Sequence, residues 1–147
     1  MESQLRIDTS SPVFSNAITV RYGECDMQGV VFNPNYMVYV DDVCDRWLIA
    51  SLGADWKTRF DVVLKKATVE WHTAARHGDQ IDFALAVTRW GNTSFDVTVT
   101  AEVAGKRIIT ATVLYISVAP GSHVPVPLSA EIREALSAPA LPSSQRA

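Results

Sequence analysis

One segment with helical spacing, followed by a long alternating run, constrains the fold of this chain more than any other feature. Between residues 34 and 51 the apolar side chains recur at steps of three and four, the spacing of one face of an α-helix. From residue 62 to residue 118 apolar and polar residues mostly alternate, which is typical of strands with one buried face. Because a sheet with one apolar face has to be covered, and only one long helix is predicted, that helix is expected to cover it.

Local signals set the boundaries of the predicted elements. A first strand is expected at 13–21, where β-branched and aromatic residues precede a glycine-containing loop. Asn33 is expected to cap the helix, Pro34 to occupy its first position and Gly53 to end it. Turn signals divide the later run into four strands; they are His77-Gly78-Asp79, Gly91-Asn92 and Ala104-Gly105. A short helix is expected at 129–136.

These elements predict an α+β fold in which a curved antiparallel sheet of five or six strands wraps around one long central helix. The segment 108–118 is apolar on both faces and is therefore expected in the interior of the sheet. We expect a flexible arm at 1–12, a single domain at 13–136 and a flexible tail at 137–147, since both ends are polar or rich in proline.

Composition excludes several function classes. The 147 residues, 48% of them hydrophobic and 20% charged, are typical of one globular domain. A net charge of −3 argues against nucleic-acid binding, and no apolar run approaches the roughly 20 residues that cross a membrane. Because the first residues do not form a signal-peptide pattern, we expect a cytoplasmic protein.

The sequence predicts no metal site. The histidines and cysteines lack the spacing of zinc ligands; they are His72, His77, His123, Cys25 and Cys44. The sequence also has no Gly-x-Ser-x-Gly nucleophile motif and no glycine-rich phosphate loop. We therefore expect no cofactor, and chemistry carried by ordinary side chains and backbone groups.

The loop that enters the long helix holds the best candidate for such chemistry. Asp26 lies seven residues before Asn33, and Gly29 allows the loop between them to turn tightly. The first turn of a helix has unpaired N–H groups and a positive dipole end, which polarise a carbonyl oxygen placed there. The Asp26 carboxylate could then act on the carbonyl carbon, as in acyl transfer. An aspartate in a loop is also commonly just a turn residue, so the surrounding motif decides between the two interpretations.

That motif, VRYGECDMQGVVFNPNYMVYVDDV, resembles the signature of the 4-hydroxybenzoyl-CoA thioesterase family within the hotdog-fold superfamily. The residues that carry the resemblance are Asp26, Gly29, Val30, Val31, Asn35 and Tyr36. The later strands resemble the family pattern too, including its turns at Gly78-Asp79 and at Gly91-Asn92-Thr93-Ser94. The resemblance covers about residues 13–136.

The resemblance implies an acyl-CoA thioesterase that hydrolyses an acyl or aroyl thioester. It assigns catalysis to Asp26 and the oxyanion-hole donor to the backbone N–H of Asn33. Substrate contacts are expected at Gly29, Phe32, Tyr36, Trp71, Arg89, Asn92, Thr93 and Ser94. Tyr36 also has the spacing of a packing residue. Coenzyme A would be part of the substrate, and the assembly would be a homodimer, often a homotetramer, with the site at the subunit boundary.

Several alternatives stay open at this point. Asp26 is either a nucleophile that forms a mixed anhydride or a general base that activates water. The acyl group, and the choice between coenzyme A and a carrier protein as its donor, are not fixed by the sequence. A hotdog hydratase or dehydratase is a second hypothesis, although the histidine that such relatives usually carry in this loop is absent, with Asn33 where many relatives have it. A non-catalytic acyl-CoA binder is a third.

Overall fold

The computed structural model describes residues 11–142 of the chain, in which five strands and two α-helices form one domain. The elements are β1 (Phe14–Thr19), α1 (Asn35–Leu52), β2 (Asp61–Trp71), β3 (Gln80–Trp90), β4 (Ser94–Val103), β5 (Lys106–Val118) and α2 (Ala130–Ser137). Residues 1–10 of the predicted arm and 143–147 of the predicted tail lie outside the described residues.

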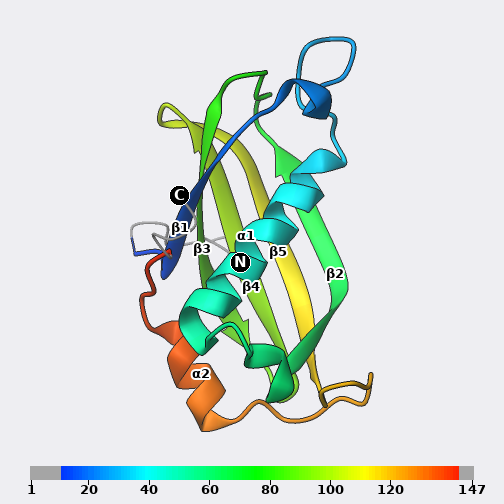
Figure 1. Cartoon of the computed structure of the whole chain (residues 1–147), viewed down its shortest axis with the longest axis vertical. Coiled ribbons are helices and arrows are strands. Elements are labelled where there is room, and N and C mark those ends of the chain that lie inside the picture. Colours follow the sequence, from blue (N-terminus) through cyan, green and yellow to red (C-terminus); the bar gives the residue numbers. More distant parts are fainter. Residues whose placement is uncertain (1–10, 143–147) are drawn as a thin grey trace, which may run out of the picture.

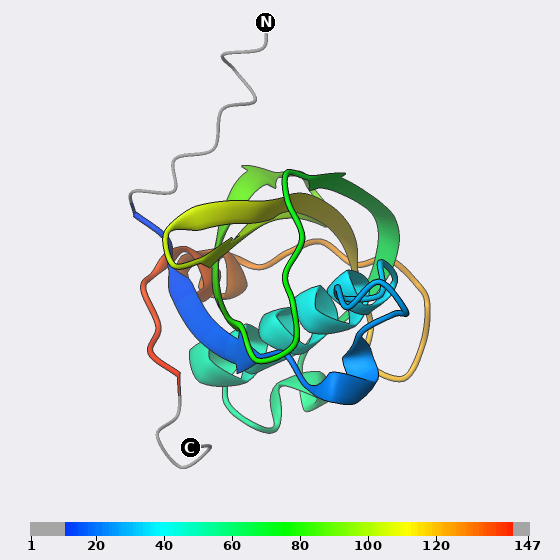
Figure 2. The same cartoon turned by 90° about the horizontal axis from the view of Figure 1, so that it is seen from above.

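The five strands form one antiparallel sheet in the order β1-β3-β4-β5-β2. The predicted antiparallel sheet is therefore confirmed with five strands, and β5 is an interior strand as its two apolar faces indicated. Figure 1 shows α1 lying across the sheet between the two edge strands, β1 and β2. Figure 2, seen from above, shows the sheet curving around α1.

The core lies between α1 and the concave face of the sheet. The buried residues of α1 recur at three and four positions, as the sequence predicts; they are Tyr36, Tyr39, Val40, Val43, Cys44, Trp47 and Leu48. They pack in one cluster with inward-facing strand residues such as Phe83, Phe95 and Val113. Enclosing each large apolar side chain contributes about 1.5–3 kcal/mol, so this interface holds the helix on the sheet.

The helix begins one residue later than expected, and the predicted cap is wrong. Pro34 occupies the cap position and Asn35 is the first helical residue. The chain enters through a tight turn in which the Asn35 N–H donates to the Phe32 carbonyl at 2.8 Å. The Asn35 side chain turns back and donates to the Glu24 carbonyl at 2.9 Å. This tie to the preceding loop shifts the helix start away from Asn33.

The remaining connections hold the ends of the sheet. Ala104 and Gly105 have φ values of 50° and 82°, the two positive values of a type I′ hairpin turn, as predicted between the last two strands. At the opposite end, Arg133 of α2 donates to the Gly91 carbonyl at 2.7 Å and lies over the Trp90 ring. Within residues 11–142, no helix is long and apolar enough to span a membrane.

Candidate active site

Asp26 lies on a small hairpin between β1 and α1, which we call the Asp26 hairpin (residues 24–32). Cys25 and Val31 pair across it, and the Asp26 N–H donates to the Val30 carbonyl at 2.8 Å. Gly29 at the bend has a φ of 80°, a conformation that favours glycine. Val31 in turn donates to the Ala75 carbonyl at 2.9 Å, so the hairpin extends toward the segment between β2 and β3.

The Asp26 carboxylate is exposed, and only one of its two oxygens accepts hydrogen bonds from its own loop. Its Oδ1 accepts from the Gln28 N–H at 2.8 Å and from the Val30 N–H at 3.5 Å, the pattern of an Asx turn. Its Oδ2 has no hydrogen-bond partner among residues 11–142. The loop therefore orients the side chain through one oxygen and leaves the other available.

The start of α1 has a free backbone donor at the predicted position. The N–H groups of Asn35 and Tyr36 donate to Phe32 and Asn33 carbonyls respectively. For the Asn33 N–H, by contrast, the described part of the chain provides no acceptor, and the residue is exposed. An unpaired N–H at the positive end of an 18-residue helix is suited to an oxygen that gains negative charge.

Glu24 fastens the hairpin to α1 at its other arm. Its Oε1 accepts from the Tyr39 hydroxyl at 2.9 Å and from the Arg21 N–H at 2.9 Å, and its Oε2 lies 3.2 Å from the Arg21 guanidinium. Partial burial raises the pKa of the Glu24 carboxyl, but these hydrogen bonds and the Arg21 charge outweigh it and hold the pKa below the ordinary value. The carboxylate is therefore ionised at neutral pH.

Two tyrosines on successive turns of α1 reach the two sides of this loop. Tyr39 donates to Glu24, while the Tyr36 hydroxyl accepts from the Ala75 N–H at 3.1 Å. Burial raises the pKa of both phenols, and for Tyr39 the hydrogen bond to Glu24 and the Glu24 charge raise it further. Both hydroxyls therefore keep their protons at physiological pH.

The predicted site residues separate into two groups at opposite ends of the sheet. The near group surrounds the start of α1 and contains Asp26, Gly29, Phe32, Asn33, Tyr36 and Trp71. Tyr36 is buried and packs edge-on against Trp71 at 6.2 Å between ring centroids, whereas Phe32 and Trp71 are about half exposed, at 53% and 48%. The far group, Arg89, Asn92, Thr93 and Ser94, lies around the β3–β4 turn. A single chain therefore does not bring the two groups together.

The far group is largely engaged in holding its own turn. Arg89 donates to both oxygens of Asp96, at 3.0 and 3.1 Å, and to the Ser94 hydroxyl at 3.0 Å. The Asn92 carbonyl accepts from the Leu128 N–H at 2.9 Å, which ties the turn to the segment before α2. Arg76 lies closer to the Asp26 hairpin than the far group does, because its backbone pairs with Val30 of the hairpin.

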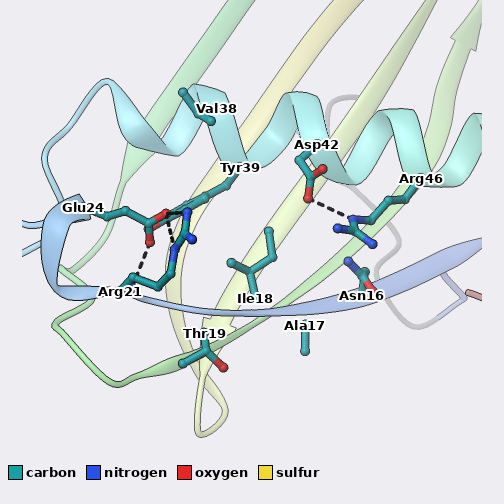
Figure 3. A pocket seen from close by; sticks show the side chains of 10 residues that line it. All are labelled: Asn16, Ala17, Ile18, Thr19, Arg21, Glu24, Val38, Tyr39, Asp42 and Arg46. Atoms are coloured by element: carbon teal, nitrogen blue, oxygen red, sulfur yellow. Dashed lines mark hydrogen bonds and ion pairs between the residues drawn. The ribbon is translucent and has the colours of Figure 1, made fainter. Parts of the chain in front are cut away.

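Among residues 11–142, a cleft lies on each side of α1, and Asp26 lines neither of these two. One of about 690 Å³ lies between β1 and α1; Figure 3 shows the Arg21–Glu24–Tyr39 contacts at one end and the Asp42–Arg46 ion pair at the other. The other, of about 510 Å³, lies between α1 and β2 and is lined by Asp41, Asp45, Lys57 and Leu64 among others. Within the described residues, no group of three or more metal-ligating side chains is present.

Sequence reasoning missed Glu24 and Tyr39. Tyr39 follows Tyr36 by three residues on the apolar face of the helix, and a buried tyrosine needs a partner for its hydroxyl. Glu24 follows Arg21 by three residues, the spacing at which a carboxylate caps a short turn. These two signals together could have indicated the pair, although only the fold shows that the two side chains meet.

Comparisons with known proteins agree with this architecture. A family model described as the thioesterase-like superfamily matches residues 20–136. No match was found among curated proteins.

Solved structures from several bacteria share the fold. A 1,4-dihydroxy-2-naphthoyl-CoA thioesterase from Synechocystis is 19% identical with a TM-score of 0.72, over 84% of this chain and 94% of that one. A protein from Pseudomonas aeruginosa is 22% identical with a TM-score of 0.78, over 90% and 96%. A thioesterase from Thermus thermophilus, in complex with coenzyme A and zinc, is 20% identical with a TM-score of 0.73, over 83% and 90%.

Proposed function

Because the chain belongs to the thioesterase-like superfamily, we propose that it hydrolyses a coenzyme A thioester to a free acid and coenzyme A. The family resemblance predicted from the Asp26 motif is thereby confirmed at the level of the superfamily. One observation carries the proposal to this chain's own residues. The Asp26 hairpin is fastened to α1 beside an N–H group, that of Asn33, which has no acceptor among residues 11–142.

In the proposed reaction the thioester carbonyl oxygen binds to the Asn33 N–H. The helix dipole adds to this donor, so negative charge on the oxygen is stabilised as the carbonyl carbon becomes tetrahedral. The Asp26 carboxylate either attacks that carbon, releasing the coenzyme A thiolate and forming an anhydride that water cleaves, or removes a proton from an attacking water. A mass spectrum of rapidly quenched enzyme separates the routes, because only the first places the acyl group on Asp26.

A second copy of the chain completes the site in this proposal. β2 is an edge strand of 11 residues whose free side offers unpaired backbone groups. Trp71 is exposed and lies at the end of β2 nearest the Asp26 hairpin. Antiparallel pairing of two β2 strands would place it beside the first half of the partner's β2. We therefore propose a homodimer, with the homotetramer as two such dimers, and a substrate site that both subunits line.

A thiol-release assay tests the proposed activity. Purified protein is offered benzoyl, hydroxybenzoyl, phenylacetyl and fatty acyl-CoA thioesters, and free thiol is measured against time. We expect hydrolysis of at least one, with kcat/KM of about 10⁴ M⁻¹s⁻¹ or more for a good substrate. A carrier-protein thioester of the same acyl group then tests whether coenzyme A is the preferred donor.

Two outcomes would contradict the proposal. Water addition to an enoyl-CoA without thiol release would identify a hydratase. Saturable binding of acyl-CoA with no product over hours would identify a binding protein. Neither alternative has a structural observation in its favour here, since the hairpin has a carboxylate and no histidine.

A further inference from the structure

The cleft between β1 and α1 ends at a hydrogen-bonded cluster that the proposed chemistry does not use. The cluster consists of Arg21, Glu24 and Tyr39, and Figure 3 shows all three side chains meeting where the chain leaves β1 for the Asp26 hairpin. Its members come from two parts of the chain, because Tyr39 lies on α1, 15 residues after Glu24. A contact of this kind links the helix to the loop before it.

Glu24 is bound to α1 through both its backbone and its side chain. The Glu24 carbonyl accepts from the Asn35 side chain at 2.9 Å and from the Phe32 N–H at 3.0 Å. The Glu24 carboxylate accepts from Tyr39, which is only 4% exposed and packs against the Phe83 ring. Glu24 is therefore the point at which the arm carrying Asp26 is fixed to the rigid part of the fold.

Three groups donate to the Glu24 carboxylate, namely the Arg21 backbone N–H, the Arg21 guanidinium and the Tyr39 hydroxyl. The Arg21 side chain is 82% exposed, and solvent screens an ion pair of that kind to a small contribution. The Tyr39 hydroxyl is held by its buried ring, so its bond to the carboxylate is pre-organised and charge-assisted. Among these donors Tyr39 is the one on α1, so we expect it to contribute most of the anchoring of the carboxylate to the helix.

We infer that Glu24 is a positioning residue, whose bond to Tyr39 holds the Asp26 carboxylate in place relative to the free N–H of Asn33. This inference rests on the proposed function for its effect on turnover. Asp26 lies only two residues beyond Glu24, so a shift of the anchor is transmitted to the carboxylate over one short extended stretch. The geometric part of the inference, that the Glu24–Tyr39 bond fixes the hairpin, stands independently of any reaction.

Two variants perturb the bond from its two sides, one by deleting its donor and the other by removing the charge of its acceptor. Tyr39→Phe deletes only the hydroxyl, and Glu24→Gln keeps the shape of the side chain but removes its charge. Glu24→Asp retains the charge on a shorter side chain and serves as the conservative variant. The matched control is Asp42→Asn, which breaks the Asp42–Arg46 ion pair at the other end of the same cleft without touching the hairpin.

Amide hydrogen exchange reports directly whether the Glu24–Tyr39 bond holds the Asp26 hairpin in place. The amides to follow are those of Asp26, Val31 and Phe32, which bond within or beside the hairpin. Loss of a charge-assisted hydrogen bond should speed their exchange about tenfold in Tyr39→Phe and Glu24→Gln. Exchange in β4 and β5 should stay as in the wild type, and Asp42→Asn should leave the hairpin unchanged.

Steady-state kinetics on the best thioester measures the effect of a displaced hairpin on turnover. We expect kcat to fall about 10- to 100-fold in both variants, since small misplacements of a catalytic group have effects of that size, while KM stays within about twofold. Glu24→Asp should recover part of kcat. Loss of kcat with unaltered exchange, or unaltered exchange and unaltered kcat in Tyr39→Phe, would overturn the inference.

The two arms keep this inference distinct from the proposed function. If the wild type releases no thiol from any thioester, the proposed function fails, while the exchange arm still decides whether Glu24 fixes the hairpin. If the wild type is active and hairpin exchange in Tyr39→Phe equals that of the wild type, the inference fails alone.

Discussion

The buried hydroxyls of Tyr36 and Tyr39, near the start of α1, each have one hydrogen-bond partner among residues 11–142. Their contributions to the free energy of unfolding can therefore be measured one at a time. The Tyr36 hydroxyl is the acceptor for the Ala75 N–H, and both residues are almost fully enclosed, at 1% and 0% exposed. A buried N–H that loses its acceptor keeps the full cost of leaving water. A substitution by phenylalanine at such a position separates the energetic contribution of the hydrogen bond from that of packing, because phenylalanine fills nearly the same space as tyrosine.

Tyr36→Phe should therefore lower the free energy of unfolding by about 1–3 kcal/mol. The reason is the orphaned Ala75 N–H, since the ring and its contacts with Trp71 and Tyr39 remain. Urea unfolding followed by circular dichroism measures the change. Tyr22→Phe is the control, because the Tyr22 side chain is 81% exposed and its hydroxyl is free to bond to water. Equal stability of the two variants would contradict the assigned hydrogen bond.

The Glu24 carboxylate makes a second residue-scale prediction, on pH. Its folded pKa lies below the ordinary value of 4.5, so its stabilisation is present above about pH 4.5 and is lost as the pH falls through the folded value. The groups that face it are the Arg21 guanidinium and the Tyr39 hydroxyl, and burial together with the Glu24 charge raises the pKa of Tyr39. The stability difference between the wild type and Glu24→Gln should be largest at neutral pH and shrink in acid. Urea titrations at several pH values test this, and a difference that grows in acid would contradict it.

At the scale of elements, β2 has the features of a strand built to pair with itself. Leu64 and Trp71 lie opposite the inward residues Tyr115 and Ile109 of β5, while Lys66 and Glu70 lie opposite Leu114 and Thr110 on the outer face. A two-fold axis at Thr68 would place Lys66 against Glu70 of the partner subunit, twice by symmetry. Because the bulge between Leu64 and Lys66 shifts the register by one residue, the same axis would also bring Leu64 of one subunit against the exposed Trp71 side chain across the interface.

The charge pattern makes this register testable. Lys66→Glu should weaken the dimer about tenfold or more, because like charges then face each other at two symmetric positions. The double variant Lys66→Glu with Glu70→Lys should restore the dimer, since the pair is only exchanged. Analytical ultracentrifugation measures the dissociation constant. A monomeric wild type, or a double variant weaker than the single one, would contradict this pairing.

The long elements were predictable from the sequence because their signals are local. Helical spacing and the glycine at position 53 located α1 to within one residue at each end, and alternation located the four later strands. The Asp26 hairpin could be recognised because Asp26 and Gly29 lie within a few residues of each other. The helix cap was missed because the Asn35 side chain bonds to Glu24, a contact 11 residues away that no local pattern encodes.

The far group, around the β3–β4 turn, marks the limit of prediction from the sequence. The resemblance predicts Arg89 and Ser94 at the substrate site, yet the antiparallel sheet carries the β3–β4 turn to the end opposite the Asp26 hairpin. Their role with the substrate depends on how subunits assemble, and one sequence pattern does not encode that. The same holds for Glu24 and Tyr39, whose contact depends on α1 packing against the end of β1.

At the scale of the whole molecule, the domain has one continuous core that includes α2. Leu136 of α2 is fully buried and belongs to the same cluster as the inward faces of α1 and the sheet. Arg133 adds hydrogen bonds from α2 to the β3–β4 turn. A small domain with one core is expected to unfold in a single cooperative step.

Leu136→Ala should therefore lower the stability of the whole domain by about 2–5 kcal/mol without creating a second transition. The cavity that it leaves is shared by α2 and the main core, so α2 does not melt separately. Unfolding followed both by tryptophan fluorescence and by circular dichroism checks that the two curves coincide. Leu141→Ala, at a position 86% exposed, is the control and should change stability by less than about 0.5 kcal/mol. Two separate transitions would contradict a single core.

The most direct test of the account is the turnover of Asp26→Asn. Asparagine keeps the Oδ1 that accepts from the Gln28 N–H, so the hairpin should keep its shape while the negative charge is lost. We predict that kcat on the best thioester falls about 10²- to 10⁴-fold, the range for loss of a catalytic base, with an unchanged melting temperature. Hydrolysis at the wild-type rate by folded Asp26→Asn would contradict the assignment of this carboxylate to the reaction.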